Sequence, residues 1–180
     1  MRIIAGELKG RRLKPPTWDG LRPTSDKMRE TLFNILGPRV TGARLLDGFA
    51  GTGAIGIEAL SRGAAHVTFV DRDRRATALI ATNLTALSVG EGYTIQDGDV
   101  VSVLKRMPDN ARFDVIVLDP PYDAAAVRDA LDAAADRLAD DGLLVLERAT
   151  RREPDVSARL TRVRDVKSGD STLTFMTVQR

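Results

Sequence analysis

The sequence predicts an α/β protein in which a mostly parallel, Rossmann-like sheet ends in a C-terminal β-hairpin. From residue 43 onward, short β-rich runs alternate with helical patterns, which is typical of a parallel sheet wound with helices on both faces. The tail departs from this alternation, because two β-rich runs flank the Ser-Gly-Asp-Ser turn at residues 168–171. A chain of 180 residues has the length of about one domain. We therefore expect one main domain with at most an appendage.

The main domain is expected to contain five β–α units followed by the hairpin. Strands are expected where short β-rich runs occur, and helices where apolar residues recur at helical spacing. The expected strands cover residues 43–47, 66–71, 93–96, 112–119 and 142–148, and the hairpin covers 160–180. The expected helices cover residues 54–63, 74–87, 100–107 and 124–138, the last within an Ala- and Asp-rich amphipathic segment at 123–141.

Residues 1–22 are expected to form a small, basic N-terminal extension made of a β-hairpin and a loop. The runs RIIAG (2–6) and GRRLKPP (10–16) predict two short strands joined by a tight connection. Prolines, an aspartate and a glycine then indicate an irregular loop at residues 15–20. The main domain is expected to follow at residues 23–180.

The main domain is expected to begin with a helix. Thr24 or Ser25 supplies a side-chain oxygen for its N-terminal cap, and Gly37 marks its end. The apolar side chains expected on one side of this helix are Met28, Leu32, Ile35 and Leu36.

The residue types present exclude several kinds of chemistry. The sequence has no cysteine, which removes disulfides, thiolate metal ligands and a thiol nucleophile. His66 is the only histidine, which is too few for a His-rich metal site or a Ser-His-Asp triad. We therefore expect no metal site, and a chemistry that depends on carboxylates, backbone dipoles, hydroxyls or a cofactor.

Charge is unevenly distributed along the chain. The net charge is +2, but residues 1–40 hold nine Lys and Arg against four Asp and Glu, whereas residues 41–180 hold eighteen against twenty-one. A basic excess at one end indicates an anionic partner, with a solubilising tail as the alternative. No apolar run approaches the roughly 18 residues of a membrane span, and Met1 leads into a basic segment without a secretory signal. We expect a cytoplasmic protein with no membrane partner.

The stretch GTGAIG at residues 51–56 satisfies the G-x-G-x-x-G fingerprint, which would favour NAD. Asp47 at the expected strand end argues against NAD, because its carboxylate would lie where a pyrophosphate needs backbone N–H groups. A cationic ligand suits this arrangement better. S-adenosylmethionine carries a sulfonium and an ammonium but no phosphate, so we expect it as the cofactor, bound by Asp47, Gly51 and Gly53.

Two further aspartates follow expected strands. Asp71 can accept hydrogen bonds from both ribose hydroxyls, and Asp99 can accept one from the adenine amino group. Open α/β sheets bind ligands at the carboxyl ends of their strands. Each aspartate alone would be an ordinary solvated acid, but three at successive strand ends indicate a cofactor site.

The run DPPY at residues 119–122 is the chemical motif. Its prolines stiffen the chain, so the carboxylate of Asp119 and the carbonyl oxygen of Pro120 become fixed acceptors for the N–H bonds of an exocyclic amine. Such acceptors favour a pyramidal amine and stabilise the charge that develops as a methyl group is transferred. Pro121 completes the rigid turn, and Tyr122 offers a flat face for a base swung out of its stack.

Asp119 favours guanine as the acceptor base. Guanine presents N1–H and the N2 amine as adjacent donors, which one carboxylate can accept together, whereas adenine presents a donor beside an acceptor, which suits asparagine better. Adenine N6 stays open, because an aspartate can also serve adenine through one oxygen. Cytosine C5 is excluded, because that reaction needs a cysteine nucleophile.

Three segments, LRPTSDKMRETLFNIL, LLDGFAGTGAIGIEALSRGA and DPPY, resemble the RsmD family of small-subunit ribosomal RNA guanine-N2 methyltransferases, and the resemblance covers nearly the whole chain. It implies a seven-stranded class I methyltransferase fold with S-adenosylmethionine as donor. It implies as acceptor the N2 of one guanine in 16S rRNA, within a small ribosomal subunit or an assembly intermediate. We expect a monomer. One departure is Gly48, where related sequences often carry an apolar residue, and we expect it to loosen the turn slightly.

The resemblance also assigns a role to the basic extension, which would bind RNA through Arg11, Arg12, Lys14 and Arg22. Trp18 either stacks on RNA or serves as a packed hydrophobic anchor. An adenine-N6 DNA or RNA methyltransferase and a non-catalytic, RNA-binding ribosome-assembly factor remain as alternatives. A glutamine-N5 protein methyltransferase would favour asparagine at position 119, and an NAD oxidoreductase is opposed by Asp47.

Overall fold

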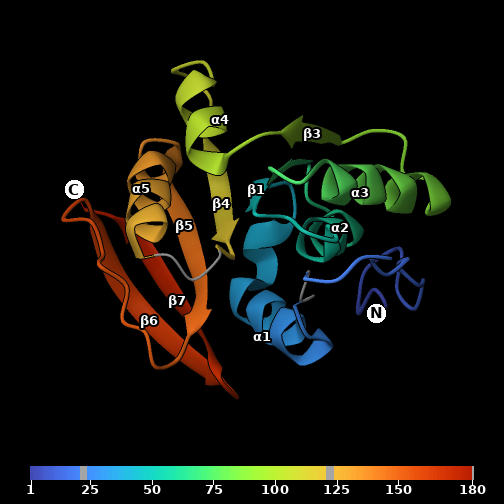
Figure 1. Ribbon diagram of the computed structural model, residues 1–180, viewed down its shortest axis with the longest axis horizontal. Coiled ribbons are helices and arrows are strands. Elements are labelled where there is room, and N and C mark those ends of the chain that lie inside the picture. The colour runs from blue at the N-terminus through green and yellow to red at the C-terminus, as the bar shows by residue number, and fades with distance from the viewer. Residues whose placement is uncertain (21–23, 121–123, 180) are drawn as a thin grey trace.

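The computed structural model describes residues 1–20, 24–120 and 124–179, which are built around one seven-stranded sheet (Figure 1). The strand order is β3-β2-β1-β4-β5-β7-β6. The strands are β1 (Arg44–Gly48), β2 (His66–Asp71), β3 (Tyr93–Asp97), β4 (Phe113–Leu118), β5 (Leu138–Ala149), β6 (Leu160–Ser168) and β7 (Ser171–Val178). The helices are α1 (Asp26–Leu36), the 3-10 helix η1 (Gly37–Val40), α2 (Ala54–Ser61), α3 (Arg74–Ala86), α4 (Val100–Arg106) and α5 (Ala124–Ala135).

The sheet is parallel from β1 to β5 and antiparallel beyond. Strand β7 runs antiparallel to both β5 and β6, so the chain ends in a hairpin at the edge of the sheet. The predicted mostly parallel, Rossmann-like sheet with a C-terminal hairpin is confirmed. Because the five parallel strands end at the same edge, residues that follow them gather there.

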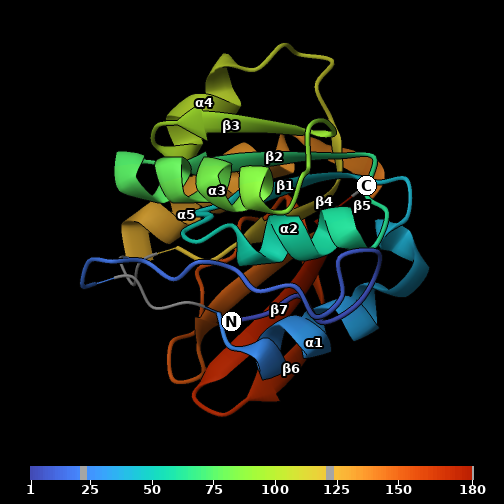
Figure 2. The ribbon, with the colours of Figure 1, turned by 90° about the vertical axis from the view of Figure 1, so that its right-hand side faces the viewer.

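Helices cover both faces of the sheet (Figures 1 and 2). On one face α1, α2 and α3 pack against strand residues such as Leu45 and Val115. On the other face α4 and α5 pack against their neighbours Leu46 and Ile116. Successive strand residues therefore alternate between two cores, as the two-residue period of a strand requires. In the described part of the chain, no helix has both the length and the hydropathy of a membrane span.

Helix α1 begins and ends where the sequence predicts. Of the two candidate caps, Ser25 is the one used, since its Oγ accepts a hydrogen bond from the N–H of Met28 at 3.1 Å. Gly37 follows the last turn with a φ of 53°, a conformation that favours glycine.

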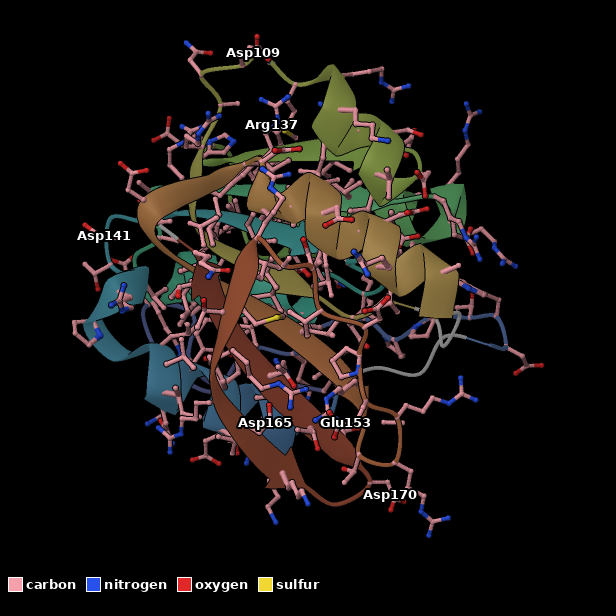
Figure 3. All side chains as sticks on the ribbon, turned by 90° about the vertical axis from the view of Figure 1, so that its left-hand side faces the viewer. Asp109, Arg137, Asp141, Glu153, Asp165 and Asp170 are labelled. Atoms are coloured by element: carbon pink, nitrogen blue, oxygen red, sulfur yellow. The ribbon has the colours of Figure 1, made fainter. Side chains whose placement is uncertain are left out.

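The helix expected at residues 124–138 is shorter than predicted, and the strand after it is longer. Helix α5 ends at Ala135, and β5 begins at Leu138. Arg137 between them is buried, and its guanidinium donates hydrogen bonds to three carbonyl oxygens at and beyond the end of α4 (Figure 3). These bonds hold the chain in a turn, and no helix follows β5 among the described residues. The main domain therefore has four β–α units and a fifth parallel strand, rather than the five units expected.

The two strands expected near the N-terminus are absent from the described residues 1–20. One isolated antiparallel bridge joins Arg2 and Arg12. Around this bridge the N–H of Ile3 donates to the carbonyl oxygen of Arg11. The next two N–H groups, those of Ile4 and Ala5, donate instead to the carboxylate of Glu58 in α2 at 2.8 and 3.0 Å. The segment is thus docked on the main domain by a side chain far away in the sequence, which a local pattern cannot reveal.

Glu58 is the centre of a buried polar network. Its side chain and that of Arg29 from α1 are both fully buried, and Arg29 Nη1 lies 3.7 Å from Glu58 Oε2. Arg62 Nε donates to Glu58 Oε1 at 2.8 Å. Arg29 also donates to the carbonyl oxygen of Arg2 at 2.9 Å. The network therefore ties the N-terminal segment, α1 and α2 to one another.

Candidate active site

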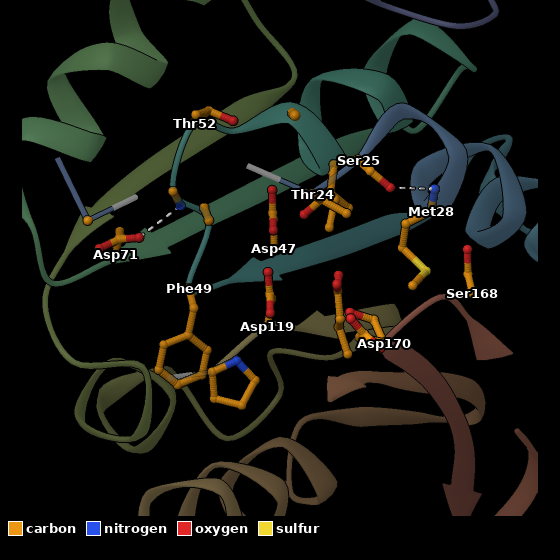
Figure 4. Close-up of a pocket in the computed structure, with 18 of the residues that line it drawn as sticks. Thr24, Ser25, Met28, Asp47, Phe49, Thr52, Asp71, Asp119, Ser168 and Asp170 are labelled. Atoms are coloured by element: carbon orange, nitrogen blue, oxygen red, sulfur yellow. Dashed lines mark hydrogen bonds between the residues drawn. The ribbon is translucent and has the colours of Figure 1, made fainter. Parts of the chain in front are cut away.

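A cavity of about 690 Å³ opens at the carboxyl ends of the parallel strands (Figure 4). Its walls come from the start of α1, the loop between β1 and α2, the ends of β2 and β4, strand β5 and the turn between β6 and β7. Its acidic lining residues are Asp47, Asp71, Asp119, Glu147 and Asp170. This volume suits a small-molecule ligand, and the carboxylates favour a cationic one. Within the described ranges, no group of three or more His, Cys, Asp or Glu could hold a metal ion.

The glycine-rich loop lets the backbone turn sharply between β1 and α2. Gly51 and Gly53 have φ values of 56° and 75°, a region that favours glycine. Gly51 borders the cavity, whereas Gly53 is not among its lining residues. A Cβ on Gly56 would meet the Phe69 ring at 2.2 Å, so α2 packs directly on β2. The predicted contact of Gly53 with a cofactor stays a prediction.

Strand β1 extends one residue beyond its predicted end at Asp47. Gly48 still pairs with Val70 and Leu118, and a Cβ on it would meet the Leu118 side chain at 2.6 Å. Gly48 therefore belongs to the sheet, where it allows close packing, and it does not loosen the turn as expected. The turn begins at Phe49, whose φ of 62° is unusual for a residue with a side chain.

Asp47 borders the cavity from a buried position. Its side-chain Oδ2 accepts a hydrogen bond from the N–H of Gly56 at 2.8 Å. The pKa of Asp47 is raised to about 8, mainly because the side chain is buried. The hydrogen bond from Gly56 partly offsets this rise, and the negative charges of Asp119 and Asp71 add to it. A cation in the cavity would favour the ionised form of Asp47.

We expect Asp47→Asn to stabilise the ligand-free protein increasingly as the pH rises from about 4 to about 8. The pKa of Asp47 in the folded protein lies above the ordinary value of 3.8, so over this interval the folded state keeps a proton that the unfolded chain has released. The wild-type free energy of unfolding therefore falls as the pH rises, and asparagine removes this dependence. Urea unfolding of both proteins at about pH 5 and about pH 8 measures the difference. A stability difference that stays constant between these two values would contradict the raised pKa.

Asp71 holds the end of β2 against the glycine-rich loop. Its Oδ2 accepts a hydrogen bond from the N–H of Gly51 at 2.8 Å, and its Oδ1 accepts one from the N–H of Asp73 at 2.9 Å. The side chain is half-buried and lines the cavity. Because a carboxylate has about four lone-pair sites, it can also accept hydrogen bonds from a ligand.

Asp99 has a structural role in the helix that follows β3. It caps α4, since its Oδ2 accepts a hydrogen bond from the N–H of Ser102 at 2.9 Å. It is exposed and is not among the lining residues of the cavity. Its expected contact with adenine therefore stays a prediction.

Asp119 and Pro120 follow β4 and line the cavity. The N–H of Asp119 donates to the carbonyl oxygen of Gly48 at 3.3 Å, which fixes the start of the motif against β1. Figure 4 shows Asp119 close to Asp47 within the cavity. Pro121 and Tyr122 lie outside the described residues, and the roles expected for them stay predictions.

Three carboxylates lie on the same face of the sheet, on or directly after the neighbouring strands β1, β4 and β5: Asp47, Asp119 and Glu147. The residue two positions before each carboxylate belongs to the core under α1, α2 and α3; these residues are Leu45, Val117 and Val145. Because strand side chains alternate, the three carboxylates share this face. Glu147 was not predicted as a site residue, although the apolar run GLLVL before it resembles the runs before Asp47 and Asp119.

The turn between β6 and β7 contributes Ser168, Gly169, Asp170 and Ser171 to the cavity, and the start of α1 contributes Thr24, Ser25 and Met28. These residues were also missed as cavity residues. No local pattern could have found the turn, because only the long-range pairing of β7 with β5 brings it to the site.

The basic residues of the N-terminal segment lie near α3. Arg11, Arg12 and Lys14 have exposed side chains, and Arg11 donates to the carbonyl oxygen of Ala86 at the end of α3. The backbone N–H of Lys14 donates to the Asn83 side chain. Arg11 and Lys14 therefore both lie beside α3, and Arg12 is exposed between them in the sequence, whereas Arg22 lies outside the described residues.

Trp18 is half-buried and lies against a cation. The guanidinium of Arg75, at the start of α3, is 5.2 Å from the centre of its ring. The two roles expected for Trp18, stacking on RNA or serving as a packed hydrophobic anchor, stay predictions.

The sequence matches a protein-family model described as "Conserved hypothetical protein 95" over residues 1–177. It is 39% identical over 151 residues to "Ribosomal RNA small subunit methyltransferase D" of Escherichia coli (strain K12), which covers 82% of this chain and 74% of that protein. It is 40% identical over 150 residues to "Putative rRNA methyltransferase YlbH" of Bacillus subtilis (strain 168), which covers 82% of each. It is also 32% identical over 133 residues to "tRNA (guanine(10)-N2)-dimethyltransferase" of Methanothermobacter thermautotrophicus, covering 68% of this chain and 37% of that protein.

Solved structures have the same architecture. "Putative methyltransferase yhhF from Escherichia coli" superposes with a TM-score of 0.87 at 34% identity, over 99% of this chain and 98% of that one. The putative methyltransferase SMU.776, complexed with SAH, has a TM-score of 0.69 at 17% identity, over 85% of this chain and 49% of that one. The second likeness concerns the fold alone.

Proposed function

This chain belongs to the family described as Conserved hypothetical protein 95, the RsmD family, and from that premise we propose that it transfers a methyl group from S-adenosylmethionine to the exocyclic N2 of one guanine in 16S ribosomal RNA. The observation that carries the proposal is the meeting of Asp119 with the buried Asp47 in one cavity at the carboxyl edge of the sheet. The relatives named as rRNA methyltransferases support RNA as the substrate class. The relative named as a guanine-N2 enzyme supports the acceptor atom.

The residues around the cavity fit S-adenosylmethionine. A buried carboxyl group whose pKa is raised to about 8 gains strongly from a neighbouring cation, and this ligand offers a sulfonium and an ammonium. NAD fits less well, because its pyrophosphate would approach the buried carboxyl group of Asp47 and would oppose the ionisation of that group, whereas a cation favours it. When bound, S-adenosylmethionine supplies an electrophilic methyl group. Asp71 can accept hydrogen bonds from its ribose hydroxyls, and Gly51 allows a close approach.

Asp119 and Pro120 prepare the acceptor amine. The guanine N2 lone pair is delocalised into the ring, which makes this nitrogen a poor nucleophile. A carboxylate and a carbonyl oxygen that accept its two N–H bonds favour a pyramidal nitrogen with its lone pair directed at the methyl group. The same acceptors stabilise the positive charge that forms on nitrogen. The product ammonium is acidic enough to lose its proton to solvent, so no strong base is needed.

Mapping of methylated guanines tests the proposed reaction. Ribosomal RNA from cells with and without the gene is digested to nucleosides and fragments, and N2-methylguanosine is located by mass spectrometry. We expect one 16S rRNA guanine to lose its N2-methyl group when the gene is absent. Loss of an N6-methyladenine instead would replace this function with the adenine alternative, and an unchanged methylation map would favour the non-catalytic assembly factor.

We propose that residues 1–22 act as the RNA-binding extension of a methyltransferase domain at residues 23–180. We expect the triple variant Arg11→Ala, Arg12→Ala, Lys14→Ala to bind RNA more weakly, because these cationic side chains are exposed, close together in the sequence and able to contact phosphates. Removing one bound phosphate lowers the slope of log affinity against log salt by about 0.7 to 0.9. RNA binding across a salt series measures this slope.

A matched triple variant with Lys105, Arg106 and Arg112 changed to alanine controls for the loss of positive charge, because these exposed residues lie in and after α4. It is expected to keep the wild-type slope, and both variants are expected to bind S-adenosylmethionine normally. If the slope of log RNA affinity against log salt concentration is the same for the wild type and the Arg11, Arg12, Lys14 variant, these side chains contact no phosphate.

We further propose that the enzyme acts as a monomer in the cytoplasm, on a small ribosomal subunit or an assembly intermediate and without a membrane partner. Comparing the methylation rates of free 16S rRNA and of assembled subunits tests whether the substrate is an assembled particle. Faster methylation of free RNA would reject the assembled particle as the substrate. Sedimentation equilibrium tests the monomer.

A further inference from the structure

We infer that Glu147 is a specificity-determining residue that accepts a hydrogen bond from N1–H of the target guanine while Asp119 accepts one from its N2 amine. The inference rests on the proposed function, because it names the contact by which the same cavity distinguishes guanine from adenine.

The sheet brings the two carboxylates side by side. Strands β4 and β5 are parallel neighbours, and Leu118 pairs with Leu146, so Asp119 and Glu147 occupy the next register positions. Neighbouring strands lie about 5 Å apart, which is close to the size of one edge of a base. Both residues lie on the face of the sheet that α1 covers, and both line the cavity. Two donors on one edge of a base can therefore meet one carboxylate each.

The chemistry of methyl transfer leaves N1–H in need of an acceptor. If Asp119 and the Pro120 carbonyl accept the two N–H bonds of the amine, the neighbouring N1–H of guanine is directed at a third position. A donor that leaves water without finding an acceptor weakens binding substantially. Glu147 is half-buried and lines the cavity, so a hydrogen bond from N1–H to its carboxylate is stronger than one in water.

The same position rejects adenine. Adenine carries a lone pair at N1, where guanine carries a hydrogen, so a carboxylate there faces an acceptor. Discrimination by an unpaired or repelled group is stronger than discrimination by shape alone. Glu147 would thus determine the choice that Asp119 by itself leaves open.

The test exchanges donor and acceptor on both partners. The methylated guanine, once mapped, is replaced in ligated 16S rRNA by 2-aminopurine, which keeps the 2-amino group but has an acceptor at N1. Small subunits assembled with each RNA are substrates for the wild type and for Glu147→Gln. We expect Glu147→Gln to lower kcat/KM for guanine about 10- to 100-fold. We expect it to raise the ratio of 2-aminopurine to guanine methylation at least about tenfold, because the glutamine amide can donate to N1.

Controls separate this inference from the function on which it rests. If the wild type transfers no methyl group to guanine subunits, the proposed function fails. If the wild type is active and Glu147→Gln keeps the wild-type ratio, the inference alone fails. The variant Glu91→Gln makes the same chemical change at an exposed position before β3 and is expected to behave as the wild type.

A second variant covers the case in which the glutamine protein does not fold, as judged by thermal unfolding and S-adenosylmethionine affinity. Glu147→Asp keeps the charge but withdraws the carboxylate by one methylene. We expect it to lower kcat/KM for guanine about tenfold and to leave the rate on 2-aminopurine within about twofold, because that base has no N1–H to lose. Equal losses on both bases would overturn the inference.

Discussion

Asp119→Ala is expected to lower the rate of methyl transfer by about 10²- to 10³-fold while largely preserving S-adenosylmethionine affinity. The carboxylate acts on the acceptor amine, where it orients the nitrogen lone pair and stabilises the developing positive charge, and losing one such preorganised group typically costs this much. Asp47 and Asp71, which remain in the variant, carry the predicted cofactor contacts. Single-turnover methylation of small subunits measures the rate, and calorimetry measures the cofactor affinity.

Asp109→Ala serves as the matched control for Asp119→Ala. Asp109 is an exposed aspartate in the loop before β4, at the opposite end of that strand from the cavity (Figure 3). It is expected to retain the wild-type rate. A near-normal single-turnover rate for Asp119→Ala would remove this residue from the reaction, and a parallel loss of cofactor affinity would move its role to the cofactor.

Glu58→Ala is expected to lower the free energy of unfolding by about 3 to 5 kcal/mol, which is the usual effect of removing one partner of a buried ion pair. The backbone N–H groups of Ile4 and Ala5 lose their acceptor. The guanidinium of Arg29 keeps its ion pair with the partly exposed Asp26 but loses the buried charge of Glu58, and its Nε and Nη1 already make no hydrogen bond within the described residues. Urea unfolding measures the change.

Two further variants make this prediction specific. Glu58→Gln keeps one carbonyl acceptor but loses the charge, so an intermediate loss of stability is expected. Glu30→Ala removes an exposed glutamate from α1 and is expected to stay within about 0.5 kcal/mol of the wild type. Losses of similar size for Glu58→Ala and Glu30→Ala would show that the buried network contributes little.

Features set by residues close together in the sequence could be predicted. The alternation of apolar runs and turns located the strands and helices, and Ser25 and Gly37 marked the limits of α1. Asp47, Asp71 and Asp119 were found because each lies at or just after the end of a strand, and parallel strands end at one edge of the sheet. Part of the lining of the cavity could therefore be predicted from the sequence.

Features that depend on distant residues could not be predicted. Pairing between residues 2–6 and 10–16 stops at the bridge between Arg2 and Arg12, beyond which the N–H groups of Ile4 and Ala5 donate to the distant side chain of Glu58. The end of α5 depends on the bonds that Arg137 makes to the end of α4. Glu147 lies inside a long strand rather than after a short one, so its place beside Asp119 follows only from the register of β4 and β5.

The most direct measurement of the central claim is methyl transfer by the purified protein. Small ribosomal subunits from cells that lack the gene are incubated with the protein and S-adenosylmethionine carrying a labelled methyl group, and the rRNA is digested to nucleosides. We predict that the label appears as N2-methylguanosine at one 16S position and that Asp119→Ala greatly slows its appearance. Label in N6-methyladenosine, or no label in rRNA from a protein that binds S-adenosylmethionine, would contradict the claim.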